Sequence, residues 1–343
     1  MVRLVSDVWT YRKAGIDLSK HKLMHERALN AIKELAKKLG INVKDLSGYA
    51  SSIMYKDKEI VLHVDGVGTK TLVLQKLNRL EVIGWDCVAM NVNDVVCIGA
   101  KPLALLDYIV LPESNEEIFG RVINGIVEAS KVSNVAIVGG ETAIMPDLVS
   151  GVDAACFVMA ERLYDIPKRD LKGHVVIGIE SWGLHANGYT LLRKIIESKL
   201  GSYNVKLEDI DISEEIGRPT AIYSNLILDA LSKGLISSAT HITGGAFTKL
   251  RRILSNSFDI TLKMPEPKPI FKLIAKLGNV PLSEMYRVFN MGIGMVVTTP
   301  KDCVEEFMNL TSKYGFKSWV LGDIHSGKGK IYIKTFTGDI IEY

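Results

Sequence analysis

The stretch His63-Val-Asp-Gly-Val-Gly-Thr-Lys70 leaves an apolar run at 60–64 and turns through two glycines. An apolar run that is broken by glycine is typical of a β-strand that ends in a tight turn. Glycine lets backbone N–H groups approach phosphate oxygens, lysine adds a positive charge, and aspartate can hold magnesium. The stretch therefore favours a phosphate-binding turn, with an ordinary polar turn as the alternative. It has neither the Walker A spacing nor the dinucleotide-binding glycine pattern.

Patterns of helices and strands extend on both sides of this turn. We expect helices at 21–39, 85–96, 116–131, 189–198, 220–231, 246–254 and 302–313, and strands at 60–64, 103–111, 135–138, 154–160, 175–179, 296–299 and 319–321. Mixed elements in both halves predict an α/β (α+β) protein of two sheet-and-helix domains. The polar, proline-containing segment 166–170 marks the boundary, which gives domains at 1–167 and 168–343.

Composition excludes several classes of protein. The 343 residues are 47% hydrophobic and 24% charged, and 42 basic residues against 39 acidic ones give a net charge of +3. This balance provides no nucleic-acid footprint. The four cysteines form no C-x-x-C pair, which favours buried, reduced thiols over a zinc site. We see no signal peptide and no apolar run that could span a bilayer, so we expect a cytoplasmic protein without membrane contact.

Acidic and amide side chains gather at two further places in the first half. Asn91 and Asp94 lie three residues apart in a predicted helix, on one face, and Asp86 precedes them in the same apolar segment. Hard oxygen ligands of this kind suit magnesium, and helix capping is the alternative. Gly139-Gly140-Glu141-Thr142 follows a strand that we expect to be buried, which favours a phosphate and metal site over a helix start.

Two glycine-rich loops in the second half carry a histidine before a predicted helix. One contains His185, Asn187 and Gly188, and the other contains His241, Thr243, Gly244 and Gly245. Free N–H groups at a helix start bind anions, although Asn187 could simply cap its helix. The two loops suit a substrate that carries a phosphate. No Ser-His-Asp order or activated cysteine is evident.

Taken together, the motifs resemble those of the aminoimidazole ribonucleotide synthetase family. They are Tyr11–Asp17, Asp65–Lys70, Met90–Asp94, Gly99–Leu103, Leu106–Tyr108, Val138–Ala143, His185–Tyr189, Arg218–Thr220, His241–Gly245 and Met285–Asn290. Several are shared with thiamine monophosphate kinase, selenophosphate synthetase and a hydrogenase maturation protein. The Tyr11 arm, the Met285 segment and the chain length distinguish the synthetase.

The resemblance implies a homodimer whose N-terminal sheets form a barrel, and a reaction of ATP with formylglycinamidine ribonucleotide that gives aminoimidazole ribonucleotide, ADP and phosphate. ATP would phosphorylate the formyl oxygen before the ring closes. The catalytic residues expected are Lys70, His185 and His241. Asp65, Asp94 and Glu141 would hold Mg2+. ATP would be bound by Asp65, Gly66, Gly68, Thr69, Lys70, Asp86, Asn91, Asp94, Asp107, Gly139, Gly140, Glu141 and Thr142, and the phosphorylated substrate by His185, Asn187, Gly188, Thr243, Gly244 and Gly245.

The sequence departs from the family pattern in two places. The segment 46–53 holds one glycine where the family usually has a glycine-rich loop, so the covering of ATP is expected to differ. Lys13 stands where an acidic residue is usual. Two alternatives remain open: a kinase or synthetase of the same superfamily, with thiamine monophosphate as the first acceptor to consider, and a nucleotide-binding scaffold without turnover.

Overall fold

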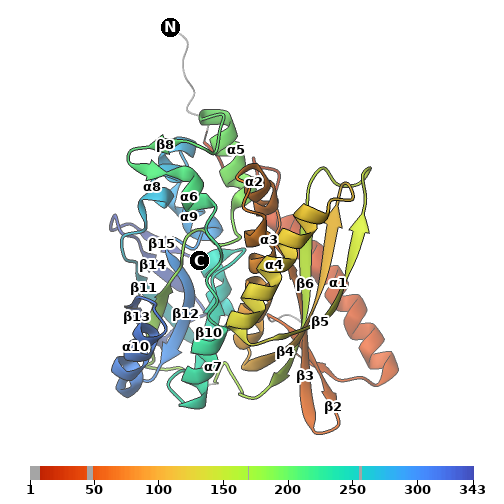
Figure 1. Ribbon diagram of the computed structural model, residues 1–343. Helices are drawn as coiled ribbons and strands as arrows, with labels where there is room; N and C mark the ends of the chain where they lie inside the picture. Colours follow the sequence, from red (N-terminus) through yellow and green to blue (C-terminus); the bar gives the residue numbers. More distant parts are fainter. Residues whose placement is uncertain (1–7, 45–48, 169, 255–256) are drawn as a thin grey trace.

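The computed structural model describes residues 8–44, 49–168, 170–254 and 257–343, and it contains two mixed sheets with helices packed on each (Figure 1). The first sheet has the order β1 (Val43–Lys44), β2 (Ser51–Tyr55), β3 (Lys58–Gly66), β6 (Asp153–Arg162), β4 (Ala100–Leu111) and β5 (Ala136–Ile144). The second has the order β10 (Ser238–His241), β12 (Ile293–Thr299), β7 (Val175–Glu180), β13 (Ser318–Ser326), β11 (Phe258–Lys263), β14 (Ile331–Lys334) and β15 (Ile340–Glu342). A small hairpin joins β8 (Lys206–Leu207) and β9 (Ile210–Asp211).

The helices follow the sheets along the chain. They are α1 (Leu18–Leu39), α2 (Lys70–Lys76), α3 (Leu80–Val96), α4 (Glu116–Ser133), α5 (Tyr189–Lys199), α6 (Ile212–Ile216), α7 (Ser224–Ser232), α8 (Pro269–Gly278), α9 (Leu282–Val288) and α10 (Val304–Lys313), with the 3-10 helices η1 (Ala246–Arg252) and η2 (Lys301–Cys303). None of the described helices is long and apolar enough to cross a membrane.

Helices α3 and α4 cover one face of the first sheet (Figure 1). They approach closely at two glycines: a Cβ on Gly84 would lie 1.9 Å from the Val122 carbonyl oxygen, and one on Gly125 would lie 1.8 Å from the Glu81 carbonyl oxygen. Each helix therefore presents a glycine to the backbone of the other. Helix α3 is buried on nearly every side, between the sheet and the second domain, and its buried residues include polar ones.

The two domains share a hydrophobic core and a polar seam. The core beneath the first sheet continues into the second domain through residues such as Ile227 and Met295. At the seam, the extended segment 218–223 is held by side chains of α2 and α3. The Asn93 amide donates to one of its carbonyl groups and accepts one of its N–H groups, each at 2.8 Å, and the Trp85 indole donates to another carbonyl at 2.8 Å. These contacts fix one domain against the other.

The N-terminal arm packs on the second domain. The Trp9 N–H donates to the Gly278 carbonyl at 3.0 Å, the Tyr11 N–H donates to the Glu284 carboxylate at 2.8 Å, and Lys194 donates to the Ala14 carbonyl at 2.7 Å. The arm precedes the first sheet in sequence but belongs by packing to the second core.

Most expected elements are present, and the differences have local causes. Strand β5 continues through Gly139–Ile144, so the glycine pair lies inside an edge strand and not at the end of a buried one. Helix α7 begins at Ser224 because 218–223 is extended and bonded to α3. The elements that were not expected are helices α2, α6, α8 and α9 and strands β1, β2, β8, β9, β10, β11, β14 and β15.

Candidate active site at the domain junction

Strand β3 and helix α3 bring the first group of polar side chains together. The His63 Nδ1 lies 2.8 Å from the Asn91 Oδ1, and the His63 Nε2 lies 3.6 Å from the Asp94 carboxylate. The Asn91 amide donates to the Asp65 carbonyl at 3.1 Å. As expected from their spacing, Asn91 and Asp94 share a face of α3, which points at β3. His63 belongs to the quoted stretch but was not expected to contribute.

The second domain contributes His241 to the same group. Its Nδ1 lies 2.6 Å from the Asp94 Oδ1, and both residues are buried. The His241 Nε2 faces the Asn93 amide at 3.5 Å, inside the seam. The ring therefore holds the Asp94 carboxylate in place, and its own atoms are not exposed to a substrate. This differs from the expected catalytic role of His241.

The charges in this cluster act on one another. Burial alone would raise the pKa of Asp94, but the positive charge of Lys249 and the hydrogen bond and charge of His241 together bring it well below its ordinary value. Burial and the neighbouring Asp94 raise the pKa of Asp65. The Asp65 and Asp94 carboxylates thus repel each other in a largely buried cluster, and a bound cation would relieve this repulsion.

Lys249 and Tyr49 complete the cluster, and the sequence patterns did not reveal either. The Lys249 amine donates to the Thr243 hydroxyl and lies 5.1 Å from the centre of the Tyr49 ring. The Tyr49 hydroxyl donates to the His241 carbonyl at 3.3 Å. Arg252 stacks on the same ring at 4.3 Å. The aromatic ring of the first domain thus supports two cations of the second.

The substrate-side loops lie next to this cluster. Asn187 is 9% exposed, and its amide nitrogen is buried without a hydrogen-bond partner among the described residues. A Cβ on Gly244 would lie 3.9 Å from the Asn187 Oδ1, so the two loops meet, and Gly244 itself is exposed. Gly188 and Gly245 have positive φ values of 76° and 85°, which favour glycine. Asn187 therefore has a buried amide donor without a partner, on a loop that meets the exposed Gly244.

His185 lies on the same loop as Asn187 and is fully buried. Its ring centre is 6.3 Å from that of His241, its Nε2 accepts the Ala221 N–H at 3.4 Å, and its Nδ1 has no partner among the described residues. Burial and the positive charges of neighbouring groups lower the pKa of His185 well below its ordinary value, so the ring is neutral. It supports His241 from behind, which differs from the expected contact with substrate.

Lys70 and Asp86 lie apart from the cluster. The Lys70 amine is 2.6 Å from the Asp86 carboxylate and donates to the Arg218 carbonyl at 2.6 Å, and both side chains are 0% exposed. The Asp86 Oδ1 accepts the Thr220 N–H at 2.7 Å. Eight residues along a helix make two full turns and about 80° more, so the side chains of Asp86 and Asp94 point in different directions. Lys70 and Asp86, which were expected to bind nucleotide, both belong to the seam in this structure.

The turn after β3 also contacts the second domain. The Gly66 N–H donates to the Asp65 carboxylate at 2.8 Å, and Gly68 has a φ of 68°. The Thr69 hydroxyl lies 2.9 Å from the Thr190 hydroxyl at the start of α5. The turn therefore orients the Asp65 carboxylate and also connects the two domains.

The register of the first sheet places the remaining acidic residues in a row. Asp65 pairs with Cys156, Cys156 pairs with Asp107, and Asp107 pairs with Gly140 across β3, β6, β4 and β5. A Cβ on Gly140 would lie 2.4 Å from the Asp107 carboxylate, which fills that space. Asp65 and Gly140 are three strand spacings apart, roughly 14 Å.

Glu141 lies beside Gly140 on the exposed edge strand, where its carboxylate accepts the Thr142 N–H at 2.9 Å. Among the residues that the structure describes, no three His, Cys, Asp or Glu side chains converge on one metal position. Asp65 and Asp94 fit magnesium as a pair, because this ion is commonly held by one or two carboxylates with phosphate oxygens and water. The sheet separates Glu141 from that pair.

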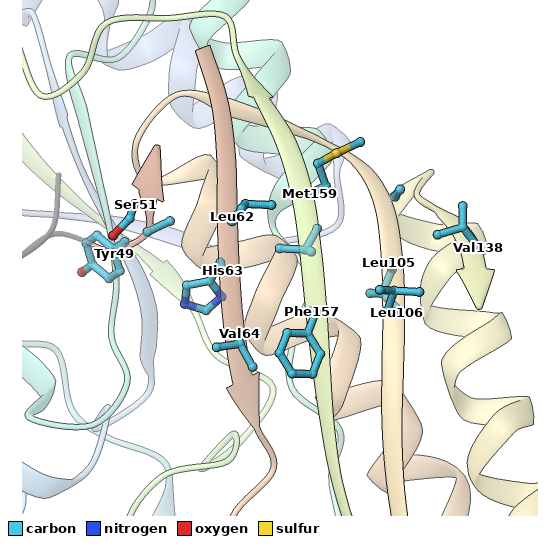
Figure 2. Close-up of a pocket in the computed structure, with 13 residues that line it drawn as sticks. Tyr49, Ser51, Leu62, His63, Val64, Leu105, Leu106, Val138, Phe157 and Met159 are labelled. Carbon is cyan, nitrogen blue, oxygen red and sulfur yellow. The ribbon is translucent and has the colours of Figure 1, made fainter. Parts of the chain in front are cut away.

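The face of the first sheet opposite α3 is bare. The side chains of Leu62, Val64, Leu106, Phe157 and Met159 point out of it and are between 40% and 55% exposed. They line a groove of about 680 Å³ that reaches Tyr49 and His63 at one side (Figure 2). Residues 46–48, the first part of the expected ATP-covering segment 46–53, lie outside the described part of the chain, whereas 49–53 lead into β2.

Comparisons with known proteins agree with this arrangement. Residues 49–160 match the N-terminal domain of AIR synthase related proteins, and residues 172–334 match the C-terminal domain. The phosphoribosylformylglycinamidine cyclo-ligase of Sulfurisphaera tokodaii is 42% identical over 96% of this chain and 98% of its own length. That of Methanocaldococcus jannaschii is 38% identical over 92% of both chains.

Solved structures of lower identity share the fold. A HypE–HypF complex superposes with a TM-score of 0.65 at 19% identity, covering 91% of this chain and 98% of that chain. Thiamine monophosphate kinase from Aquifex aeolicus gives 0.63 at 17% identity, covering 92% and 98%. At these identities the likeness concerns the fold alone.

Proposed function

The chain belongs to the AIR synthase family and is a phosphoribosylformylglycinamidine cyclo-ligase of purine biosynthesis, and on this basis we propose how its residues carry out the ATP-dependent ring closure. One observation carries the proposal. The Asp65 and Asp94 carboxylates lie close together on the first domain, and the Asn187 amide, which has no hydrogen-bond partner among the described residues, lies on the second domain. A site for a metal nucleotide thus adjoins a donor for a second, phosphorylated molecule.

The reaction takes place in two steps. The formyl oxygen of the substrate attacks the γ-phosphorus of ATP, a bond forms between that oxygen and phosphorus, and ADP leaves with the electron pair of the broken bond. The amidine nitrogen then attacks the activated formyl carbon, phosphate leaves, and the nitrogen loses a proton as the five-membered ring closes. Phosphoryl transfer of this kind depends on positioning and charge neutralisation.

We assign the polar cluster to the phosphoryl end of this reaction. Asp65 and Asp94 would hold Mg2+, which neutralises phosphate charge when bound. Asn91 and His63 orient the two carboxylates from β3 and α3, and His241 fixes the rotamer of Asp94. Glu141 is not part of this set within one chain.

We assign the glycine loops to the substrate. The Asn187 amide without a partner and the backbone of Gly244 and Gly245 lie on two loops that meet, and these loops would hold a ribose phosphate beside the metal nucleotide. His185 and His241 support these loops without contact to the substrate. With the proposed domain division at 167/168, Asp65, Asp94, Asn91 and His63 belong to the first domain, and His241 and the substrate loops belong to the second.

We further propose that the bare sheet face pairs with a second copy of this chain. An exposed apolar surface of this kind marks an interaction site, and two such faces that meet would close a barrel and bury both. Phe157→Glu should shift the protein from dimer to monomer in analytical ultracentrifugation, while Leu163→Glu, at an exposed position after β6, should leave the dimer intact. A Phe157→Glu variant that remains a dimer would exclude this face.

An isotope experiment tests whether the formyl oxygen is phosphorylated. Substrate labelled with 18O in the formyl group is converted with ATP and Mg2+, and the released phosphate is analysed by mass spectrometry. We expect one 18O atom in the phosphate, because the formyl oxygen leaves with the phosphoryl group. Unlabelled phosphate accompanied by labelled water would contradict phosphorylation of the formyl oxygen.

A further inference from the structure

The carboxylate pair at the domain junction needs a cation that can meet the transferred phosphoryl group, and Lys70 is not available for this. Its amine is fully buried and paired with Asp86. Among the described residues of the second domain, Lys249 is the lysine whose charge acts on both Asp65 and Asp94. It comes from η1, directly after the substrate loop.

Lys249 is held in a defined position by both domains. Its amine donates to the Thr243 hydroxyl of the substrate loop and lies over the Tyr49 ring of the first domain, 5.1 Å from the ring centre. Tyr49 in turn donates to the carbonyl of His241, the residue that holds Asp94. A flexible side chain is thus fixed between the loop that would carry the substrate and the carboxylates that would carry the metal.

Lys249 is partly buried, and its amine contacts the Thr243 hydroxyl, next in the chain to the exposed Gly244. Arg252, the other cation on the Tyr49 ring, lies on it at 4.3 Å and further along η1. Lys249 is therefore the better placed of the two to reach a group between the metal and the substrate loop.

We propose that Lys249 is a catalytic residue that contacts the γ-phosphoryl group as it passes from ATP to the formyl oxygen. This inference rests on the proposed function of the cluster. An ammonium ion at this position offsets the negative charge on the phosphoryl oxygens while the bond to ADP breaks and the bond to the formyl oxygen forms. It takes over the role that the sequence assigned to Lys70.

The test compares Lys249→Met and Lys249→Arg with Lys313→Met, which changes an exposed lysine on α10 of the same domain. Loss of one charged donor at a transition state typically lowers kcat by about 10²- to 10³-fold. We expect this loss for Lys249→Met, little change in the KM for the substrate, partial recovery in Lys249→Arg and wild-type kinetics for Lys313→Met. Circular dichroism melts show whether each variant is folded.

A binding measurement separates the catalytic role from a structural one. The complex of MgADP with aluminium fluoride imitates the phosphoryl group in transfer, whereas MgADP alone does not. We expect Lys249→Met to bind MgADP within about threefold of wild type and to lose most of the additional affinity for the fluoride complex. Equal losses for both ligands, or a kcat within about tenfold of wild type, would overturn the proposal.

The same measurement distinguishes failure of this inference from failure of the proposed function. If wild-type protein does not form the aminoimidazole product, the proposed function fails, and the fluoride complex still decides whether Lys249 meets a phosphoryl group. If wild-type protein is active and Lys249→Met binds the fluoride complex as tightly as wild type does, only the role of Lys249 is wrong.

Discussion

At the scale of single residues, Asp94 is the residue on which the proposed metal site depends most. This carboxylate accepts the His241 ring N–H and lies beside His63 and Asp65. Asp94→Asn keeps the shape of the side chain but removes the charge that would bind the metal. We expect kcat to fall by at least about 100-fold, as for loss of a group that acts in the transition state. ADP release at saturating substrate measures this.

A change in stability would lead to a different interpretation of Asp94. If Asp94→Asn lowers the free energy of unfolding by as much as a core substitution, about 2 to 5 kcal/mol, and leaves kcat near the wild-type value, the residue is structural. Urea unfolding of the same preparation provides this comparison.

Individual residues also show where the sequence was sufficient and where it was not. The spacing of Asn91 and Asp94 places both on one helix face, which requires only local geometry, and the structure confirms it. Lys70 follows a glycine turn as a phosphate-binding lysine would, but its partner Asp86 can be recognised only once the seam is formed. Lys249 gives no local signal, because its importance comes from Tyr49, 200 positions earlier in the chain.

At the scale of elements, the crossing of α3 and α4 is the tightest contact beneath the site. A Cβ on Gly84 or Gly125 would lie less than 2 Å from a backbone atom of the opposite helix. Either Gly→Ala substitution must therefore separate the helices, and we expect a loss of about 1 to 3 kcal/mol or more. Chemical denaturation measures the loss.

Gly120 provides a matched control on α4, since a Cβ there has no neighbour within 4 Å. Gly120→Ala should leave stability unchanged or raise it by up to about 1 kcal/mol, because alanine favours the helix. A comparable destabilisation by Gly120→Ala would show that the helix tolerates no methyl group anywhere, and the specific contact would lose its support.

The edge formed by β2, β3 and β6 predicts a pH dependence of stability. Although burial opposes it, hydrogen bonds from Ser52, Lys44 and Arg162 hold the pKa of Glu59 below its ordinary value of 4.5. Since the folded-state pKa is lowered, this stabilisation is complete above about pH 4.5 and is lost as the pH falls through the folded-state value. Glu59→Gln should lower the Tm at pH 7.

The difference in Tm between wild type and Glu59→Gln should then shrink as the pH falls below about 4.5, where the wild-type carboxylate takes up a proton. Thermal melts from pH 3 to pH 7 follow this difference. A difference that stays constant over this range would show that Glu59 acts through packing and not through charge.

Sequence periodicity located most helices and strands, since their apolar patterns are local. It stopped β5 at Gly139 because glycine commonly ends a strand, whereas pairing with β4 carries β5 on to Ile144. It started α7 at Thr220, although hydrogen bonds from α3 hold 218–223 extended. In both places a tertiary contact overrides the local preference.

At the scale of the whole molecule, the buried Lys70–Asp86 pair of the first domain holds the second domain through hydrogen bonds to the segment 218–223. Removal of one partner leaves a buried charge unpaired, which typically costs about 3 to 5 kcal/mol. Lys70→Met should destabilise the protein by this amount, and the double variant Lys70→Met with Asp86→Leu should recover part of the loss. Urea denaturation of both variants measures it. A stable Lys70→Met variant with weakened ATP binding would instead restore Lys70 to the nucleotide site.

Initial rates with and without formylglycinamidine ribonucleotide test the central claim most directly. Purified protein is supplied with ATP and Mg2+, and ADP and the aminoimidazole product are both quantified. The account predicts that ADP release requires the substrate and that one aminoimidazole forms for each ADP. Substrate-independent ADP release, or ADP release that needs thiamine monophosphate in place of the amidine, would contradict it.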